Sequence, residues 1–371
     1  MKYDKNILNI VKDKIQREYA DDVSLIVLYA TKENRDYNNI GIDFYYIPKT
    51  AKASKLSTQF IIDGTSYDFF PMSWERLVSN AALDSPQAYL LLDTQVVYYA
   101  NGEDLMRFNN LVENTKRNLY EDSFNMLYHK SYEFFNEVYI YLYNIDNVAK
   151  RILDVRIECS KMLNHIAVCL GYINRQYYNS GNGSSVSIIE ESFKLDMLPE
   201  NYENTVKAII FSKNIDEANN LVKKLIKDTR NFLTEMLLKT VQKEPFETLF
   251  TGYYEELKSI LNWFRIAIEK KDYIKMFSLA AYMHEEIAVF MMKTQSGLWY
   301  NDRNVYSEYS GYFDEYFSID LVEAICNQDD KTICERLDNF EAKIIKYMKL
   351  KNVEIKEFES IEQFQEYFNN K

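Results

Sequence analysis

Residues 60–77 read FIIDGTSYDFFPMSWERL, and this stretch decides the fold of the first part of the chain. Apolar residues flank the pair Asp63-Gly64, which favours a tight β-hairpin because both residue types tolerate positive φ. Ser73 then precedes a run with helical character, and serine is a preferred helix N-cap. The stretch therefore predicts two antiparallel strands followed by a helix.

The sequence around this hairpin extends the pattern to a small mixed α/β part. Apolar residues recur every three or four positions near the start of the chain, which predicts an amphipathic helix. Short β-branched and aromatic runs follow, and Pro48 ends one of them. The predicted elements are a helix at 4–19, strands at 23–30, 40–47, 59–62, 66–70 and 96–99, and a helix that starts at residue 74.

Glycine and proline are scarce and unevenly placed. The chain has 9 Gly and 5 Pro in 371 residues, and three of each fall in the first 103 residues. Because both residue types interrupt helices, their scarcity further on predicts long helices. We expect an α+β protein with a small mixed-sheet domain at 1–103 and a large all-α bundle at 104–371. A break near 179–200 would divide that bundle into two sub-bundles.

The bundle is predicted from a series of helical patterns. A short C-terminal helix should follow them, with Ile361, Phe364 and Phe368 on one face, and we expect this face to dock on the body of the protein. The predicted helical stretches are 103–143, 146–178, 200–212, 215–242, 245–270, 273–294 and 318–350.

Charge and hydropathy exclude several classes of partner. The 44 Lys and Arg against 56 Asp and Glu give a net charge of −12, whereas nucleic-acid binding needs a basic surface. No run approaches the roughly 18 uncharged apolar residues of a membrane helix. We therefore expect neither a nucleic-acid partner nor a membrane. The first residues alternate charged and apolar side chains without a signal-peptide core, which predicts a cytoplasmic location.

Two aspartates lie within the predicted strands. Residues two apart in a strand face the same side, so Gly41, Asp43 and Tyr45 share a face, and Asp68 interrupts an apolar strand. If these strands are neighbours, the two carboxylates converge on one hard cation such as magnesium. The alternative is that each aspartate is a strand-edge carboxylate in solvent.

The order of these elements resembles the catalytic domain of the DNA polymerase β-like nucleotidyltransferase superfamily. Its pattern is an apolar strand ending in Gly-Ser, a loop, a strand with Asp-x-Asp, and a third carboxylate on a later strand. Residues 41–43 fall on Asp-x-Asp, and Asp68 falls on the third carboxylate. The resemblance implies that Asp43 and Asp68 hold Mg²⁺ for a nucleoside triphosphate.

The sequence departs from that pattern at two places. Tyr29-Ala30 stand where Gly-Ser belongs, and Gly41 stands where one metal carboxylate belongs. A one-residue shift puts Ala30-Thr31 on Gly-Ser and Tyr45 on the second acid, and either register leaves two of three acids. The nucleotide-binding positions implied are thus Tyr29, Ala30, Thr31 and Gly41. Because a missing metal ligand usually costs orders of magnitude in rate, we expect activity that is weak or lost.

A helical domain after such an α/β domain is similar to the kanamycin nucleotidyltransferase group, whose acceptor sits between the domains. The resemblance implies transfer of a nucleotide to a hydroxyl of a small cationic acceptor of aminoglycoside type. Glu158 is then the candidate general base. Its alternative is a surface glutamate paired with Arg156. The competing hypothesis for the whole chain is a noncatalytic pseudoenzyme that binds a ligand or a protein partner.

Three further features of the helical part have two interpretations each. The segment 284–286 (His-Glu-Glu) resembles the zinc motif HExxH, but Ala288 replaces the second histidine, so ordinary helix surface is favoured. The aromatic and polar segment 296–317 is either a loop lining a ligand site or a surface loop anchored by its rings. His165 lies in a mostly apolar helix, which favours a core histidine over a catalytic one.

Overall fold

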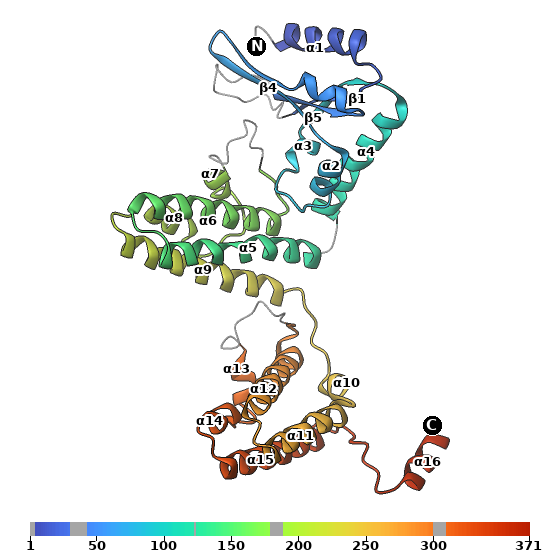
Figure 1. The fold of residues 1–371 in the computed structure, drawn as a ribbon, viewed down its shortest axis with the longest axis vertical. Coiled ribbons are helices and arrows are strands. Elements are labelled where there is room, and N and C mark those ends of the chain that lie inside the picture. The colour runs from blue at the N-terminus through green and yellow to red at the C-terminus, as the bar shows by residue number, and fades with distance from the viewer. Residues whose placement is uncertain (1–3, 30–42, 122–123, 179–187, 300–308) are drawn as a thin grey trace. The chain divides into compact units, whose positions relative to one another are not determined.

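The computed structural model describes residues 4–29, 43–121, 124–178, 188–299 and 309–371 (Figure 1). The chain divides into two compact units, Met1–Met236 (unit 1) and Leu237–Lys371 (unit 2). A small mixed sheet at the start is followed by helices, which confirms the α+β class. The boundary expected near residue 103 stays a prediction, since the α/β part and the helices after it share unit 1.

Five strands form one mixed sheet in unit 1, in the order β3-β4-β2-β1-β5. β2 and β4 are parallel, and the other neighbouring pairs are antiparallel. The predicted hairpin is present, with φ of 48° at Asp63 and 77° at Gly64, as a type I′ turn requires. The strands are β1 (Val23–Tyr29), β2 (Asp43–Pro48), β3 (Thr58–Ile62), β4 (Thr65–Pro71) and β5 (Thr94–Tyr99).

Helices cover both faces of this sheet (Figure 1). Ile26 and Phe44 pack on the side of α1, whereas Val27 and Tyr45 pack on the side of α2, α3 and α4. Full burial of such side chains contributes about 1.5–3 kcal/mol each, so both faces hold the sheet in place. The covering elements are α1 (Asp4–Glu18), the 3₁₀ helix η1 (Ala51–Leu56), α2 (Trp74–Ala81), α3 (Tyr89–Leu92) and α4 (Gly102–Lys116).

The start of α2 agrees with the sequence. The Ser73 side chain accepts a hydrogen bond of 3.2 Å from the backbone N–H of Arg76. This bond satisfies one of the free N–H groups of the first turn. The predicted N-cap is thereby confirmed.

A helical bundle completes unit 1. The pattern predicted as one helix at 103–143 is divided, because a π-helical turn, η2 (Arg117–Glu121), follows α4. α5 and α6 run antiparallel: Ser131 Oγ donates to the carbonyl of Cys169 over 2.9 Å, and Asn144 Nδ2 donates to Glu158 Oε2 over 2.9 Å. The bundle helices are α5 (Phe124–Asn147), α6 (Ile152–Ile173), α7 (Ile188–Ser192), α8 (Tyr202–Ile210) and α9 (Ile215–Leu238).

The α/β part and this bundle share one apolar core. Leu83 and Ala88 of the α/β part pack with Leu127 of α5 and Tyr172 of α6. The Tyr172 hydroxyl also donates to the carbonyl of Ser85 over 3.1 Å. Burial and hydrogen bonding therefore tie the two parts of unit 1 together.

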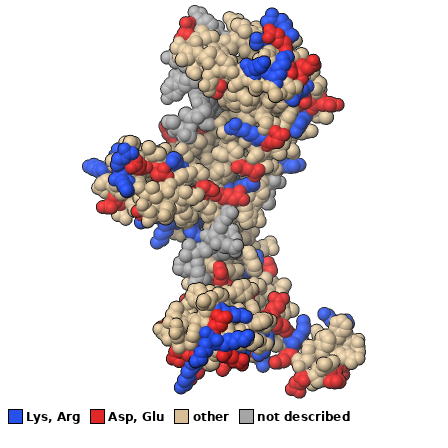
Figure 2. Space-filling view, in the orientation of Figure 1, with Lys and Arg blue, Asp and Glu red and all other residues tan. Residues whose placement is uncertain are grey.

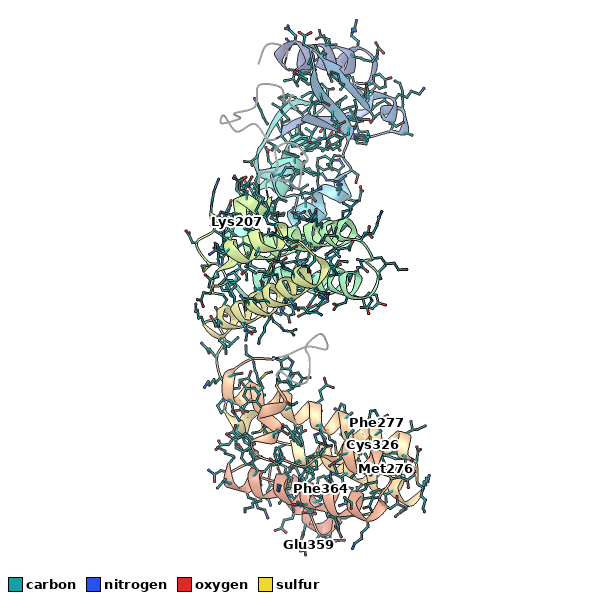
Figure 3. All side chains as sticks on the ribbon, turned by 90° about the vertical axis from the view of Figure 1, so that its left-hand side faces the viewer. Lys207, Met276, Phe277, Cys326, Glu359 and Phe364 are labelled. Carbon is teal, nitrogen blue, oxygen red and sulfur yellow. The ribbon has the colours of Figure 1, made fainter. Side chains whose placement is uncertain are left out.

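Unit 2 is all helical. The pattern predicted at 245–270 forms two helices, because the backbone is extended at Thr251, which ends the first helix, and Gly252 at φ 81° is the N-cap of the second. On α12, Met276 is buried and the next residue, Phe277, is half exposed, so the two mark the inner and outer faces of this helix (Figure 3). The helices are α10 (Phe246–Phe250), α11 (Tyr253–Glu269), α12 (Tyr273–Ser296), α13 (Ser310–Asp314), α14 (Leu321–Cys326), α15 (Asp330–Leu350) and α16 (Ile361–Asn369).

A buried carboxylate joins α11 to α15 in unit 2. Glu341 accepts hydrogen bonds from Tyr254 (2.8 Å), Lys258 (2.6 Å) and Arg265 (2.6 Å). Burial raises the pKa of Glu341, but the three hydrogen bonds outweigh this effect and lower it from 4.5 to about 2. The carboxylate is therefore charged at neutral pH, with two cations that compensate its burial.

The C-terminal helix differs from its prediction. α16 forms, and Ser360 is its N-cap: the Ser360 side chain accepts a hydrogen bond from the backbone N–H of Gln363. None of its residues is buried, and Ile361 and Phe368 are 79% and 63% exposed. The expected docking of this helix on the body is wrong in this structure, since spacing identifies an apolar face but not its cover.

Charges of both signs alternate over the face shown in Figure 2. No described helix combines the length and the apolar character that a membrane span needs.

Candidate functional site

The first candidate site lies where β2 and β4 run side by side. Phe44 pairs with Phe69 in the parallel register of these strands. Asp43 and Asp68 are the residues directly before them, so the register sets the two aspartate positions opposite each other. Asp43 is also the partner of Tyr29 on β1. The strands that carry the two predicted metal ligands are thus neighbours, as the hypothesis required.

Asp68 lies in a strand whose neighbours anchor it. Tyr67 and Phe69 are buried on the α1 side of the sheet, while Asp68 itself is half-buried and pairs with Gln59 of β3. Alternation along the strand puts Asp68 on the opposite face from these two rings. That face is the one with Tyr29 and Tyr45, where the predicted site belongs.

Aromatic rings crowd the face of the sheet on which Tyr29 lies. The ring of Tyr29 lies 5.9 Å from Tyr45, 6.0 Å from Phe70 and 6.0 Å from Tyr89, measured between centroids. The Tyr45 hydroxyl donates to the buried carbonyl of Leu90 over 2.6 Å, and burial raises the pKa of Tyr45 well above its usual value. Rigid rings therefore fill the space around Tyr29 beside β1.

Three of the predicted nucleotide-binding residues, Ala30, Thr31 and Gly41, lie outside the described residues. Both registers of the loop between β1 and β2 thus stay open. Tyr29 is the one described member of that predicted set, and its side chain is 6% exposed. If a phosphate approached the backbone of Tyr29, the Tyr29 ring would remain buried among its aromatic neighbours.

The donor set at this site suits a single magnesium ion that a ligand helps to hold. Magnesium is commonly bound by one or two carboxylates, with waters and substrate phosphates as its other ligands. The structure describes the side chain of Asp68, which is half-buried, whereas it places Asp43 by its backbone register alone. Among the described residues, no group of three or more His, Cys, Asp and Glu side chains is placed to hold a metal. Two aspartates at neighbouring strand positions are compatible with one magnesium ion that substrate phosphates help to hold.

The structure does not bring Glu158 to the two aspartates. Tyr172, which contacts the α/β part, lies about 21 Å further along α6 at 1.5 Å per residue. The Glu158 carboxylate accepts hydrogen bonds from Lys161 (2.7 Å) and Asn144 (2.9 Å), and these two partners lower its pKa. Arg156, the partner considered from the sequence, instead donates to the carbonyl of Ser212. The general-base role of Glu158 stays a prediction without a described neighbour in the site.

His165 has the environment that the core interpretation predicts. Its Nε2 lies 3.0 Å from the Tyr141 hydroxyl, and burial lowers the pKa of the ring.

A hydrogen bond links the helical bundle to the start of β5. The hydroxyl of Tyr177, which follows α6, donates to the Asp93 carboxylate over 2.9 Å.

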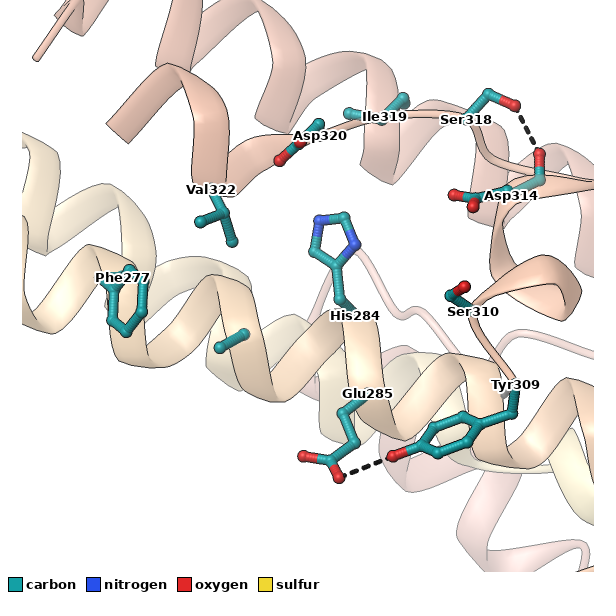
Figure 4. Close-up of a pocket in the computed structure, with 11 residues that line it drawn as sticks. Phe277, His284, Glu285, Tyr309, Ser310, Asp314, Ser318, Ile319, Asp320 and Val322 are labelled. Atoms are coloured by element: carbon teal, nitrogen blue, oxygen red, sulfur yellow. Dashed lines mark hydrogen bonds between the residues drawn. The ribbon is translucent and has the colours of Figure 1, made fainter. Parts of the chain in front are cut away.

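A second candidate site lies in unit 2, and the sequence did not locate it. A cavity of about 770 Å³ is lined by α12 and by the segment that follows residue 308. His284 and Glu285, which we expected on ordinary helix surface, contribute to its wall (Figure 4). Tyr309, Ser310 and Asp314 also line it, and the ligand-loop interpretation of the segment 296–317 stays a prediction. The sequence signal for this cavity was the high density of aromatic and polar residues in the segment 296–317.

Comparisons with known proteins bear on unit 1. The family model of the KNTase C-terminal domain matches residues 109–239, the stretch that contains α5 to α9. Together with the α/β part before it, this match confirms a kanamycin nucleotidyltransferase-like arrangement. The likeness covers the bundle of unit 1, and most of unit 2 lies beyond the matched residues.

One solved structure shows a likeness over more of the chain. The crystal structure of a nucleotidyltransferase-like protein from Exiguobacterium sibiricum 255-15, at 1.90 Å resolution, is 13% identical in sequence. The match covers 75% of this chain and 91% of the other, with a TM-score of 0.38. A comparison with curated proteins gave no match.

Proposed function

We propose that this protein is a nucleotidyltransferase-like protein that binds a nucleoside triphosphate with Mg²⁺ where β2 and β4 meet. Its transfer of the nucleotide to a hydroxyl of a small cationic acceptor is weak or lost. The observation that carries the proposal is the parallel register that sets Asp43 opposite Asp68. The KNTase C-terminal domain match in the same unit supports it.

The roles follow from the chemistry of the residues. Asp43 and Asp68 would hold the metal through carboxylate oxygens. The metal, when bound, neutralises triphosphate charge and orients the α-phosphorus for attack. Tyr29 and Tyr45 exclude water from one side of the acids, because their rings are buried and packed together. We assign no role to Glu158, since Lys161 and Asn144 already engage its carboxylate.

A second candidate function is a noncatalytic protein that retains the site for binding alone. The buried position of Tyr29, where the family has a small residue, favours this candidate. A bulky ring there restricts the backbone N–H groups that would otherwise approach the phosphates. The two candidates share the binding step and differ in whether nucleotidyl transfer follows.

Thermal unfolding with and without ligand tests the binding step. A ligand at 100 times its Kd stabilises the folded state by about 2.7 kcal/mol, so Mg²⁺ with a bound triphosphate should raise the midpoint of unit 1. The rise should vanish in Asp43→Asn and Asp68→Asn. Asp63→Asn is the matched control, because it removes the same charge from the hairpin turn and asparagine tolerates its positive φ. If no nucleoside triphosphate at millimolar concentration shifts the midpoint, the proposal fails.

Restoring the missing acid separates the two candidates. Gly41→Asp should raise Mg²⁺-dependent release of pyrophosphate at least tenfold if the enzyme lacks one ligand only. Unchanged release, with triphosphate binding retained, would favour the noncatalytic candidate.

A further inference from the structure

The cavity of unit 2 combines an apolar wall with ionisable groups. Phe277 of α12 and Val322 of α14 lie at one end of the cavity (Figure 4). Ala281 of α12 and Ile319, which precedes α14, also line it. Its volume of about 770 Å³ falls within the 300–1,000 Å³ typical of sites for small organic ligands. It lies outside the residues that match the KNTase C-terminal domain. Its ligand is therefore argued from its own chemistry.

His284 is fixed in the wall of this cavity. Its Nε2 accepts the backbone N–H of Leu321 over 3.4 Å, and its ring lies 4.3 Å from that of Phe313. Burial lowers the pKa of His284, against the opposing effect of Asp320 and Asp314. The lowered pKa favours the neutral form of the ring, whose Nε2 is the acceptor in this hydrogen bond.

Three carboxylates give the cavity a negative wall. Glu285 accepts from the Tyr309 hydroxyl over 2.9 Å. Asp320 caps α14, where its Oδ1 accepts the N–H of Glu323 over 2.9 Å, and Asp314 stands at the other end of the cavity (Figure 4). No Lys or Arg is among the described residues that line the space. The nearby Arg336 bonds the Asp320 carbonyl and the Glu323 carboxylate instead.

These acids do not converge on one point. No described group of three or more His, Cys, Asp and Glu side chains in the chain is placed to hold a metal ion. A metal ion would therefore find no set of three such ligands among the described residues of this cavity. A larger cation can reach a carboxylate with its charged group and cover apolar surface with the rest of its structure.

We propose that this cavity binds a small organic amine, with its ammonium group on the carboxylate of Asp320 and its apolar body against Phe277 and Val322. In Figure 4 these three side chains occupy the same end of the cavity. The cap engages Oδ1 of Asp320, and among the described residues no other hydrogen bond holds this exposed carboxylate. A charge-assisted hydrogen bond, which is stronger than a neutral one, can therefore form there. The inference does not rest on the proposed triphosphate site, because it uses residues of unit 2 alone.

Calorimetric titration of the full chain with three matched compounds tests this assignment. The probes are 2-phenylethylamine, 2-phenylethanol and phenylacetate, which share an aromatic body and differ in charge. The amine should bind at least tenfold more tightly than the alcohol, and the acid should not bind. Equal affinity for amine and alcohol, or tighter binding of the acid, overturns the proposal.

Variants locate the binding. Asp320→Asn should weaken the amine at least tenfold without unfolding α14, because asparagine is also a good N-cap. Asp329→Asn is the matched control: Asp329 caps α15 in the same way, through the N–H of Thr332, and does not line the cavity. Amine binding that survives Asp320→Asn unchanged overturns the assignment. Asp68→Asn should leave amine binding intact. Failure of the amine proposal can therefore be distinguished from failure of the triphosphate proposal.

Discussion

Unit 1 and unit 2 are built on different kinds of support. In unit 1 a sheet covered on both faces shares an apolar core with a helical bundle, and Leu83 and Tyr172 meet in that core. In unit 2 helices pack directly on one another, and the carboxylate of Glu341 joins two of them inside the unit. The candidate site of unit 1 follows from strand register, whereas that of unit 2 follows from a segment folding back on α12. The difference teaches that local sequence pattern locates the first kind of site and misses the second.

The largest expected effect concerns the independence of the two units. Leu127→Ala should lower the unfolding midpoint of unit 1 alone, since Leu127 is fully buried in the shared core of that unit. Such truncations cost about 2–5 kcal/mol. Differential scanning calorimetry of the full chain would show one of two transitions moving.

Leu261→Ala supplies the reciprocal control. Leu261 of α11 is also fully buried, but in unit 2, so this variant should move the other transition. A single transition that both variants shift equally would contradict the division into two independent units.

A smaller effect is expected at the buried carboxylate of unit 2. Glu341→Gln should destabilise unit 2 by about 1–3 kcal/mol, because two cations lose a charged acceptor. The pKa of Glu341 falls on folding from 4.5 to about 2. Its stabilisation is therefore complete above pH 4.5 and is lost as the pH falls through about 2. Urea unfolding from pH 7 to pH 2.5 measures this loss.

The same titration of the variant decides whether Glu341 is responsible. In Glu341→Gln the pH dependence of unit 2 over this range should flatten, while that of unit 1 stays as in the parent protein. An equally steep acid loss in the variant would assign the effect to other carboxylates.

The sequence predicted most of unit 1 because its signals are local. The Asp63-Gly64 turn, the Ser73 cap and the alternation along β4 each act within a few residues, and all three are present. Predicting that Asp43 and Asp68 occupy neighbouring positions required one further assumption, namely that β2 and β4 pair with each other. The π-helical turn at Arg117–Glu121 was missed, because no glycine or proline marks it.

Unit 2 was predicted less well, because its arrangement depends on contacts distant in sequence. The sequence around His284 predicts an exposed helix surface. His284 lines a cavity because Leu321 and Phe313, which are distant in sequence, pack against it. The apolar spacing of α16 likewise predicted a helix correctly but suggested a docking that the structure does not show. Periodicity thus predicts helices, while their partners come from tertiary packing.

The smallest expected effect follows from α16. Deleting residues 360–371 should change the free energy of unfolding of unit 2 by less than about 0.5 kcal/mol, as is usual for changes at exposed positions, because none of the helix is buried. Chemical denaturation of the truncated protein checks this expectation. A loss of several kcal/mol would mean that the helix packs on the body after all.

We propose that unit 1 retains a two-carboxylate site for a magnesium-bound triphosphate. Isothermal titration of ATP into the full chain, with and without Mg²⁺, tests it most directly. We predict binding that requires Mg²⁺, disappears in Asp68→Asn and persists in Asp63→Asn. Triphosphate binding that is equal without Mg²⁺, or unchanged in Asp68→Asn, would contradict the account.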